Sequence, residues 1–321
     1  MRFFTKKQVI LTFSLACLLL VISACGNDND DTSSSESTND KKQGSEVTVE
    51  GKKGEVTIPA DVERVLAPFH EDALLALGVK PVAKWSIGKT VQGYLEPQLK
   101  DLPRIEWNLP QEQVLEHNPE LLILGSDLAS YEGTYEDYSK IATTYVMPEE
   151  VSNNWRKQVK VFGKMLGKED KAEEVLSAYE EKASAAKEKL TKSLGEESVA
   201  IIWVVGGQYF LFEKDRHSAA VVYSELGITV PPLVESLGEA QAQWNPISME
   251  KLSELKADHV FLLGLEGEQG LETLKNSDVW QSIPAAEKDQ VYVMNDPSFW
   301  TNKGLIASEK TIDALLKTLA E

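Results

Sequence analysis

A continuous run of helix-forming residues near the middle of the chain is the feature that most restricts its fold. Residues Lys168–Leu194 are rich in Ala, Glu, Lys and Leu and contain no Gly or Pro, and Gly167 and Gly195 flank them. Glycines just outside such a run are typical of helix boundaries. A helix over residues 168–194 would be about 40 Å long, enough to run along two lobes. An ordinary packed helix within one domain is the alternative.

On both sides of this run, short apolar segments alternate with helix-forming segments. The expected strands are Val47–Val49 and Glu55–Ile58 (a hairpin), Val65–Ala67, Pro81–Lys84, Leu121–Leu124, Thr144–Met147, Val199–Val205, Tyr209–Phe212, His259–Leu263 and Val291–Met294. The expected helices include Asp72–Leu77, Gln111–His117, Tyr135–Ile141, Ala219–Leu226, Met249–Leu255 and Ile306–Leu319. Short apolar runs are typical of buried parallel strands, and their alternation with helices predicts an α/β fold.

The predicted architecture is therefore a bilobal α/β fold in which each lobe is a mainly parallel β-sheet flanked by helices. We expect an N-terminal lobe over residues 47–167, the bridging helix over 168–194 and a C-terminal lobe over 195–321. An internal repeat supports two related lobes. Trp107-Asn108 precedes the segment Glu112–Leu124, and Trp244-Asn245 precedes the similar segment Glu250–Leu262. Each segment predicts a helix opened by an acid, a short turn and a buried strand.

The first residues predict export and a lipid anchor. Arg2, Lys6 and Lys7 precede an apolar run from Val9 to Ile22, which is short for a transmembrane helix and typical of a secretory signal. The run ends in Ser23-Ala24-Cys25, which looks like a lipobox. We expect residues 1–24 to be a lipoprotein signal peptide and Cys25 to carry the lipid. The alternative is an ordinary signal with a chance cysteine.

Composition limits what the exported chain does. Of its two cysteines, Cys17 leaves with the signal, so Cys25 would have no partner for a disulfide. Residues 25–46 contain no aromatic side chain and predict the lipidated cysteine followed by a flexible tether. The formal charge is −18 and becomes about −21 without Arg2, Lys6 and Lys7. Such a charge argues against nucleic-acid binding.

Together, the lipobox, the tether, the order of lobe, long helix and lobe, and the Pro119-Glu120 pattern resemble the iron–siderophore-binding lipoproteins of ABC importers. These are class III binding proteins, a group that also includes haem and cobalamin carriers. Residues 71–79 and 223–227 look like the family's helices in the two lobes. Residues 298–308 and 312–316 are similar to the last helix of members that take ferric citrate-type and hydroxamate siderophores.

The resemblance implies a monomer that captures a ferric siderophore, of the hydroxamate or citrate type, and delivers it to an ABC permease with its ATPase. It would lie at the outer face of the cytoplasmic membrane, held by its lipid, in a Gram-positive bacterium. Family members offer one acid on each lobe to the permease. The matching positions are Glu71 or Asp72 in the first lobe and Glu225 or Glu235 in the second.

Candidate ligand-binding residues follow from the predicted strands, because ligands of open α/β sheets lie beyond the carboxyl ends of the strands. Aromatic faces would cover the apolar arms of a chelate, and arginine would form bidentate bonds to its oxygens. Each aromatic side chain could instead belong to the core. The siderophore fills the coordination shell of its iron, so we expect no protein metal ligands and no cofactor. The candidates are Phe69, His70, Trp85, Arg104, Trp107, Tyr209, Arg216, His217, Trp244, Phe299 and Trp300.

Two other functions stay open on the sequence alone. His70 or His217 could be an axial ligand of haem, which would make the chain a haem-binding transport lipoprotein. A lipid-anchored extracellular hydrolase is the alternative of another class. The chain has no Gly-x-Ser-x-Gly, His-Glu-x-x-His or phosphate-loop motif, but a pair of carboxylates would suffice for some hydrolases. We expect a binding protein and not an enzyme.

Overall fold

The computed structural model describes residues 46–320, so the predicted signal, Cys25 and almost all of the tether lie outside the described residues. The described chain begins with a β-hairpin, as expected, formed by β1 (Val47–Gly51) and β2 (Gly54–Ile58). Within residues 46–320, no helix has the length and apolar character needed to cross a membrane.

The first lobe contains two further sheets. Strands β3 (Val65–Leu66), β7 (Leu121–Leu124) and β8 (Thr143–Val146) are parallel, in that order. A second sheet has the order β5 (Thr90–Val91), β4 (Lys84–Ile87) and β6 (Arg104–Glu106). The prediction of a strand over Pro81–Lys84 is wrong. The strand begins at Lys84, whose N–H donates to the Pro103 carbonyl, whereas Pro81 has no N–H to donate.

Short helices surround these sheets and connect their strands. They are α1 (Glu71–Ala76), α2 (Glu96–Leu99), α3 (Gln111–Glu116), α4 (Tyr135–Ser139), α5 (Glu149–Ser152) and the longer α6 (Trp155–Met165). Short 3₁₀ turns over Gly93–Leu95 and Leu128–Ser130 complete the lobe. Strands and helices alternate through most of this lobe, as the sequence predicts.

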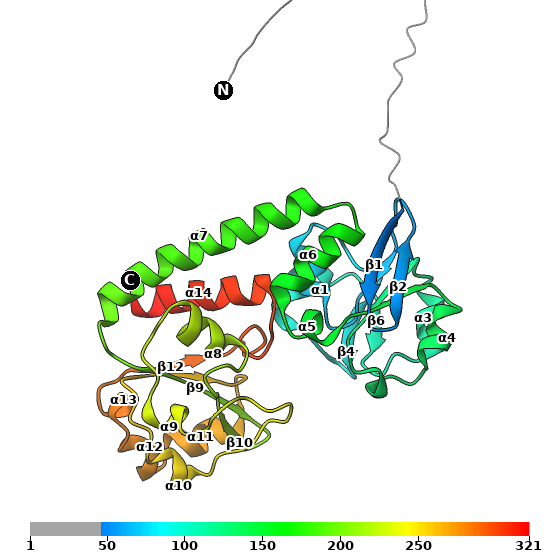
Figure 1. The fold of residues 1–321 in the computed structure, drawn as a ribbon. Helices are drawn as coiled ribbons and strands as arrows, with labels where there is room; N and C mark the ends of the chain where they lie inside the picture. The colour runs from blue at the N-terminus through cyan, green and yellow to red at the C-terminus, as the bar shows by residue number, and fades with distance from the viewer. Residues whose placement is uncertain (1–45, 321) are drawn as a thin grey trace, which may run out of the picture. The chain divides into compact units, whose positions relative to one another are not determined.

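Helix α7 (Glu169–Leu194) is one unbroken helix of 26 residues and begins one residue later than expected. Its buried positions recur every three or four residues and end at Leu190 and Leu194, so one stripe of the helix faces the protein. It packs against α6 at one end and against α14 (Leu305–Leu319) along the second lobe, as Figure 1 shows. Gly195 ends the helix with a backbone φ of 60°, which favours glycine.

The second lobe is built on one four-stranded sheet in the order β10 (Gln208–Leu211), β9 (Val199–Val205), β11 (His259–Leu263) and β12 (Val291–Met294). Strands β9, β11 and β12 are parallel, while β10 is antiparallel and lies at the edge. The bilobal fold with mainly parallel sheets is confirmed. Helices α8 (Ser218–Ala220), η3 (Val221–Glu225), α9 (Pro232–Glu235), α10 (Met249–Leu252), α11 (Gln269–Lys275), α12 (Asp278–Gln281) and α13 (Pro284–Glu287) surround it.

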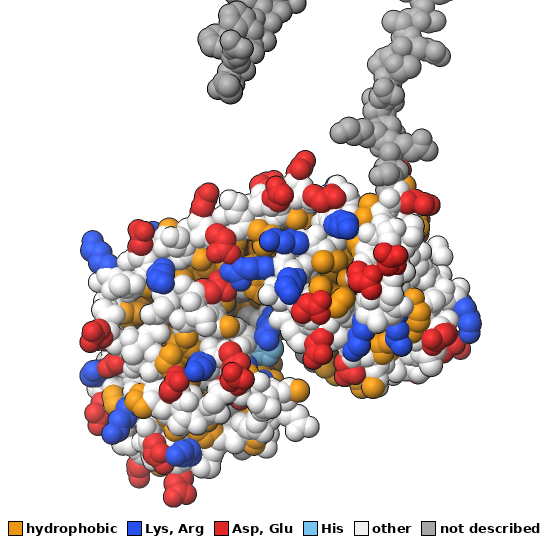
Figure 2. Space-filling view, in the orientation of Figure 1, with side chains coloured by type: hydrophobic (Ala, Val, Ile, Leu, Met, Phe, Trp, Pro, Cys, Tyr) orange, Lys and Arg blue, Asp and Glu red, His pale blue; other side chains and the backbone are white. Residues whose placement is uncertain are grey.

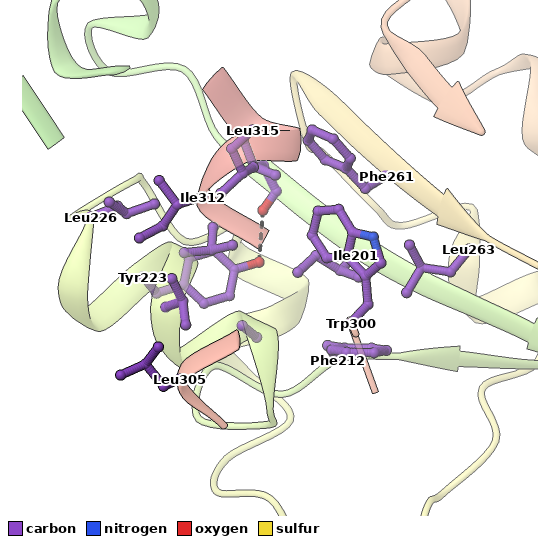
Figure 3. Close-up of a cluster of buried hydrophobic side chains, with 14 of the residues drawn as sticks. Ile201, Phe212, Tyr223, Leu226, Phe261, Leu263, Trp300, Leu305, Ile312 and Leu315 are labelled. Atoms are coloured by element: carbon purple, nitrogen blue, oxygen red, sulfur yellow. Dashed lines mark hydrogen bonds between the residues drawn. The ribbon is translucent and has the colours of Figure 1, made fainter. Parts of the chain in front are cut away.

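The core of the second lobe lies between this sheet and α14. Figure 3 shows Trp300 between Phe261 of β11 and Phe212, which follows β10, in a cluster that also includes Leu305 and Ile312 of α14. Trp300, Phe212 and Phe261 are completely buried. Large aromatic and aliphatic side chains of this kind supply most of the burial free energy of a small lobe.

A buried carboxylate joins the two lobes. Asp72 of α1 accepts hydrogen bonds from the backbone N–H groups of Ile306 and Ala307, at 3.1 and 3.0 Å, in the first turn of α14. Tyr94 donates to the same carboxylate at 3.0 Å. A carboxylate at a helix N-terminus satisfies free N–H groups and interacts favourably with the helix dipole. Asp72 therefore caps a helix of the other lobe.

A second contact between the lobes is an ion pair. Arg156 of α6 forms two bonds to the Glu225 carboxylate, of 3.1 and 2.9 Å, and Tyr179 of α7 donates to Glu225 at 2.6 Å. The guanidinium of Arg156 also lies 4.2 Å from the ring centre of Trp155. These contacts and the Asp72 cap fix the spacing of the lobes at two separate points.

Candidate functional site

A cavity of about 460 Å³ lies where the two lobes meet. Phe69, His70, Trp85 and Trp107 line it from the first lobe, and His217 and Lys303 line it from the second. Neighbouring cavities of about 240 and 390 Å³ share His217, Lys303 and Asn153 with it. We call these three cavities, which share lining residues, the cleft. Figure 2 shows the notch between the lobes, with a histidine surface inside it.

The aromatic wall of the cleft comes from one strand and two loops of the first lobe. The Phe69 ring lies 5.1 Å from the Trp85 ring and 5.8 Å from the His70 ring, in edge-to-face arrangements. Trp85 is part of β4, and Trp107 directly follows β6. Phe69 and Trp107 are 44% and 45% exposed, which is unusual for such large apolar side chains and leaves their surfaces available to a ligand.

Both histidines of the cleft are neutral at physiological pH. Burial lowers the pKa of His70 to about 4, against a smaller opposite effect of its hydrogen bond to Gln158. Burial, together with the nearby charges of Lys303 and Arg216, lowers the pKa of His217 to about 3. The His217 ring stacks on Trp244 with centroids 5.5 Å apart. Among the described residues, no group of three His, Cys, Asp or Glu side chains is arranged to hold a metal ion.

Five predicted residues, Phe69, His70, Trp85, Trp107 and His217, thus line one cavity. Several lining residues were missed by the sequence reasoning because nothing in their local pattern distinguishes them from surface polar residues. Lys303 lies just before α14, in a loop whose most prominent sequence feature is the aromatic pair Phe299 and Trp300. The other missed residues with polar side chains are Asp127, Ser130, Tyr131, Ser152, Asn153 and Gln158.

Four predicted aromatic residues do not line the cleft. Trp300 is completely buried in the core of the second lobe, and Tyr209 is 8% exposed with its hydroxyl donating to the Gly270 carbonyl. Phe299 packs against Trp300 with ring centres 5.4 Å apart. Trp244 contacts Trp203, Phe210 and Phe212 and lies behind His217. Trp300 and Tyr209 therefore serve packing, which corrects their prediction, whereas the partly buried Trp244 and Phe299 line none of the three cavities.

Of the two predicted arginines, Arg216 lines one cavity of the cleft but has its guanidinium occupied by the protein, and Arg104 lines none of the three cavities. Arg216 is 4% exposed and lines only the cavity of about 390 Å³. Its guanidinium is occupied by Glu213 and by the carbonyls of Gln241 and Gln243, and it lies 4.3 Å from the Trp244 ring. Arg104 is an exposed residue of β6 and lines none of the three cavities of the cleft.

The acids predicted to meet a permease have different surroundings. Glu71 and Asp72 are 1% and 3% exposed, so neither carboxylate is available to a docking partner, and this part of the prediction is corrected. Glu225 is occupied by Arg156 and Tyr179, and its side chain is 21% exposed. Glu235 has a side chain that is 57% exposed and pairs with Lys214 at 3.0 Å.

Glu71 follows the cleft residues Phe69 and His70 in the chain. One oxygen of its carboxylate accepts a hydrogen bond from the Trp85 N–H at 2.7 Å. The other oxygen is buried and has no hydrogen-bond partner among the described residues. Burial raises the pKa of Glu71 from 4.5 to about 8. The folded chain therefore holds a proton here that the unfolded chain releases above about pH 4.5. This contribution to stability is complete below that pH and is lost as the pH rises toward 8.

We expect Glu71→Gln to remove this dependence of the free energy of unfolding on pH. In the unmodified protein, this residue should lower the free energy of unfolding by about 1.4 kcal/mol for each pH unit between about 5 and 8, and the variant should lack that slope. Urea denaturation at several pH values measures it. Exposed Glu112, changed to Gln, is the matched control. Parallel pH profiles for the unmodified protein and Glu71→Gln would contradict the prediction.

Comparison with known proteins agrees with this arrangement. A family model described as "Periplasmic binding protein" matches residues 65–297. The iron(3+)-hydroxamate-binding protein YxeB of Bacillus subtilis is 27% identical over 98% of this chain and 99% of its own. The iron(3+)-hydroxamate-binding protein FhuD of the same organism is 27% identical over 92% of each chain.

Among solved structures, this chain is similar to a B. subtilis protein described as a FhuD fold-family periplasmic binding component of a Fep/Fec-like ferrichrome ABC transporter. It has a TM-score of 0.71 and 25% identity, and the match covers 85% of this chain and all of the other. The family consists of substrate-binding proteins, which sets the hydrolase alternative aside. The match over residues 65–297, with the two lobes, the continuous α7 and the cleft, shows that this chain belongs to the periplasmic binding protein family.

Proposed function

We propose that the chain captures a ferric siderophore in the cleft and delivers it to an ABC permease outside the cytoplasm. The observation that carries the proposal is the position of Phe69, Trp85 and Trp107 in a cavity at the junction of two rigidly spaced lobes. Aromatic walls with a few convergent polar groups suit a bulky chelate. Its iron arrives with a full coordination shell, so the cleft needs shape and polar contacts more than metal ligands.

Tryptophan fluorescence tests this proposal. A ferric siderophore bound beside Trp85 and Trp107 should quench the emission in a saturable way, and the iron-free siderophore should quench much less. Trp85→Phe with Trp107→Phe should lose most of the quenching, while Trp280→Phe, at a buried position away from the cleft, should retain it. No saturable quenching by any ferric siderophore would contradict the function.

Haem is a second candidate ligand because two neutral imidazoles line the cleft, and a neutral imidazole is the form that binds haem iron. The Nδ1 atom of His217 is buried and has no hydrogen-bond partner among the described residues. A haem titration with a shift of the Soret band that is lost in His217→Ala would favour haem over a ferric siderophore. Unchanged haem spectra would exclude it.

We also propose that Cys25 carries a lipid that holds the chain at the outer face of the membrane. The residues before Cys25 are small and follow an apolar run, which is the form of a lipoprotein signal. Cys25→Ser should move most of the protein from the membrane fraction to the medium, because each buried acyl CH₂ contributes about 0.8 kcal/mol. Immunoblots of both fractions measure this. Membrane retention of the variant would contradict the proposal.

We propose that Glu235 contacts the permease, and that Glu225, which is less exposed, can do so as well. Glu235→Lys should reduce uptake of the labelled ligand about tenfold while its Kd stays unchanged, because a charge reversal at a docking surface turns attraction into repulsion. Glu287→Lys, at an exposed helix position elsewhere on the second lobe, is the matched control. Equal uptake by Glu235→Lys and the control would remove Glu235 from the docking surface.

A further inference from the structure

The cationic side chains of the cleft are mostly occupied by the protein itself. Arg156 pairs with Glu225 at 2.9 Å, and the Nη2 atom of Arg216 lies 3.0 Å from Glu213. Lys303 makes no ion pair with any residue between 46 and 320. It lines all three cavities of the cleft. A ligand in the cleft therefore meets one cation that is available for pairing.

Two carboxylates offset this one cation. Asp127 lines the cavity of about 460 Å³, and Asp215 lines both smaller cavities. Asp127 accepts a hydrogen bond from the Ala129 N–H at 3.1 Å, and Asp215 accepts one from the Ala240 N–H at 2.8 Å. Neither forms an ion pair within the described residues, and the cleft histidines are neutral. The cleft thus has almost no net charge, with a small negative excess.

The remaining polar groups of the cavity of about 460 Å³ are neutral hydrogen-bonding groups, and they line it together with Phe69, Trp85 and Trp107. They include Ser126, Ser130, Tyr131, Ser152, Asn153 and Gln158. Amides and hydroxyls donate to the oxygens of a chelate without needing a ligand charge. The chain as a whole is strongly acidic, so an anionic ligand would also be repelled at longer range.

Ferric siderophores differ in the charge that they bring. Three hydroxamates cancel the charge of Fe³⁺, whereas three catecholates leave an excess of three negative charges, and carboxylate siderophores keep ionised carboxylates. An anionic chelate loses hydration in a partly enclosed site and needs several cations in return. We propose that the cleft selects an electroneutral or singly cationic ferric trihydroxamate against anionic ferric catecholates and carboxylates. This inference rests on the proposed function and narrows its ligand class.

A binding panel on the unmodified protein tests the inference. Ferrichrome, which is neutral, and ferrioxamine B, which has one ammonium group, should bind at least about 100-fold more tightly than ferri-bacillibactin or ferric staphyloferrin B. Raising NaCl from about 0.05 to 0.5 M should change the hydroxamate Kd by less than about threefold, because no strong charge pairing is involved. Tighter or equal binding of the anionic chelates would overturn this inference alone. Binding of none of the four would instead overturn the proposed function.

A variant with one added charge gives a second test. Asp127→Lys should improve the binding of ferri-bacillibactin. The ratio of its Kd to the Kd of ferrichrome should therefore fall by about tenfold. Asp101→Lys makes the same charge change at an exposed turn outside the cleft and should leave the preference unchanged. If both variants change the preference equally, the local charge of the cleft does not set the selectivity, and the inference fails.

Discussion

Replacing Asp72 with alanine is expected to lower the free energy of unfolding by about 3 to 5 kcal/mol. The change leaves the N–H groups of Ile306 and Ala307 and the Tyr94 hydroxyl without their buried acceptor. It also removes a negative charge from the N-terminus of α14. Urea denaturation at pH 7.5 would measure the loss. Asp170→Ala changes an exposed acid in the first turn of α7 and should cost less than about 1 kcal/mol.

Gly304 gives an independent test of the same contact. A Cβ atom at this position would overlap the Asp72 carboxylate, so Gly304→Ala should also destabilise the protein. Because both changes disrupt one interaction, the double variant Asp72→Ala with Gly304→Ala should lose less stability than the sum of the single losses. Fully additive losses, or an Asp72→Ala protein as stable as Asp170→Ala, would show that the cap does not hold the lobes together.

Trp300→Ala is expected to lower the free energy of unfolding by about 3 to 5 kcal/mol, since it leaves a large cavity between Phe212 and Phe261.

Trp85→Ala should instead affect ligand affinity more than stability. Its side chain is only partly buried, so stability should change by less than about 1.5 kcal/mol while the affinity for a ferric siderophore falls at least about tenfold. Thermal denaturation and fluorescence titration separate the two effects.

Trp107→Ala, at a cleft position that is 45% exposed, is the companion to Trp85→Ala and should show the same separation of affinity from stability. If Trp300→Ala folded with nearly unchanged stability but bound no ligand, the assignment of Trp300 to the core would be wrong. Loss of stability in Trp85→Ala comparable to that in Trp300→Ala would remove Trp85 from the cleft wall.

The sequence predicted the architecture well because hydrophobic pattern determines it. The strands at Leu121–Leu124, Val199–Val205, His259–Leu263 and Val291–Met294 have the expected bounds, and α7 is continuous. The sheet of β4, β5 and β6 was not recognised. Its strands are two to four residues long and mostly polar, so pairing with neighbours, and not an apolar run, defines them.

The site was harder to predict because exposure depends on tertiary packing. Trp107 and Trp244 occupy equivalent positions in the internal repeat, yet Trp107 lines the cleft and Trp244 packs against Phe210 and Phe212. The sequence around Arg216 looks like that of an exposed loop. Only the fold shows that Glu213, three residues earlier, occupies its guanidinium. Likewise, Asp72 matches a helix of surface residues, and only the fold shows that α14 packs against α1 and donates backbone N–H groups to this carboxylate.

The contact between Asp72 and α14 joins positions 234 and 235 residues apart in the chain. A ribosome therefore completes nearly the whole polypeptide before the acid near its beginning can reach those amides. A chain still being synthesised therefore cannot close this contact until the first turn of α14 has left the ribosome. A truncation that removes α14 would also uncover the Asp72 carboxylate and take away the N–H groups that donate to it, so the first lobe depends on a helix near the other end of the chain.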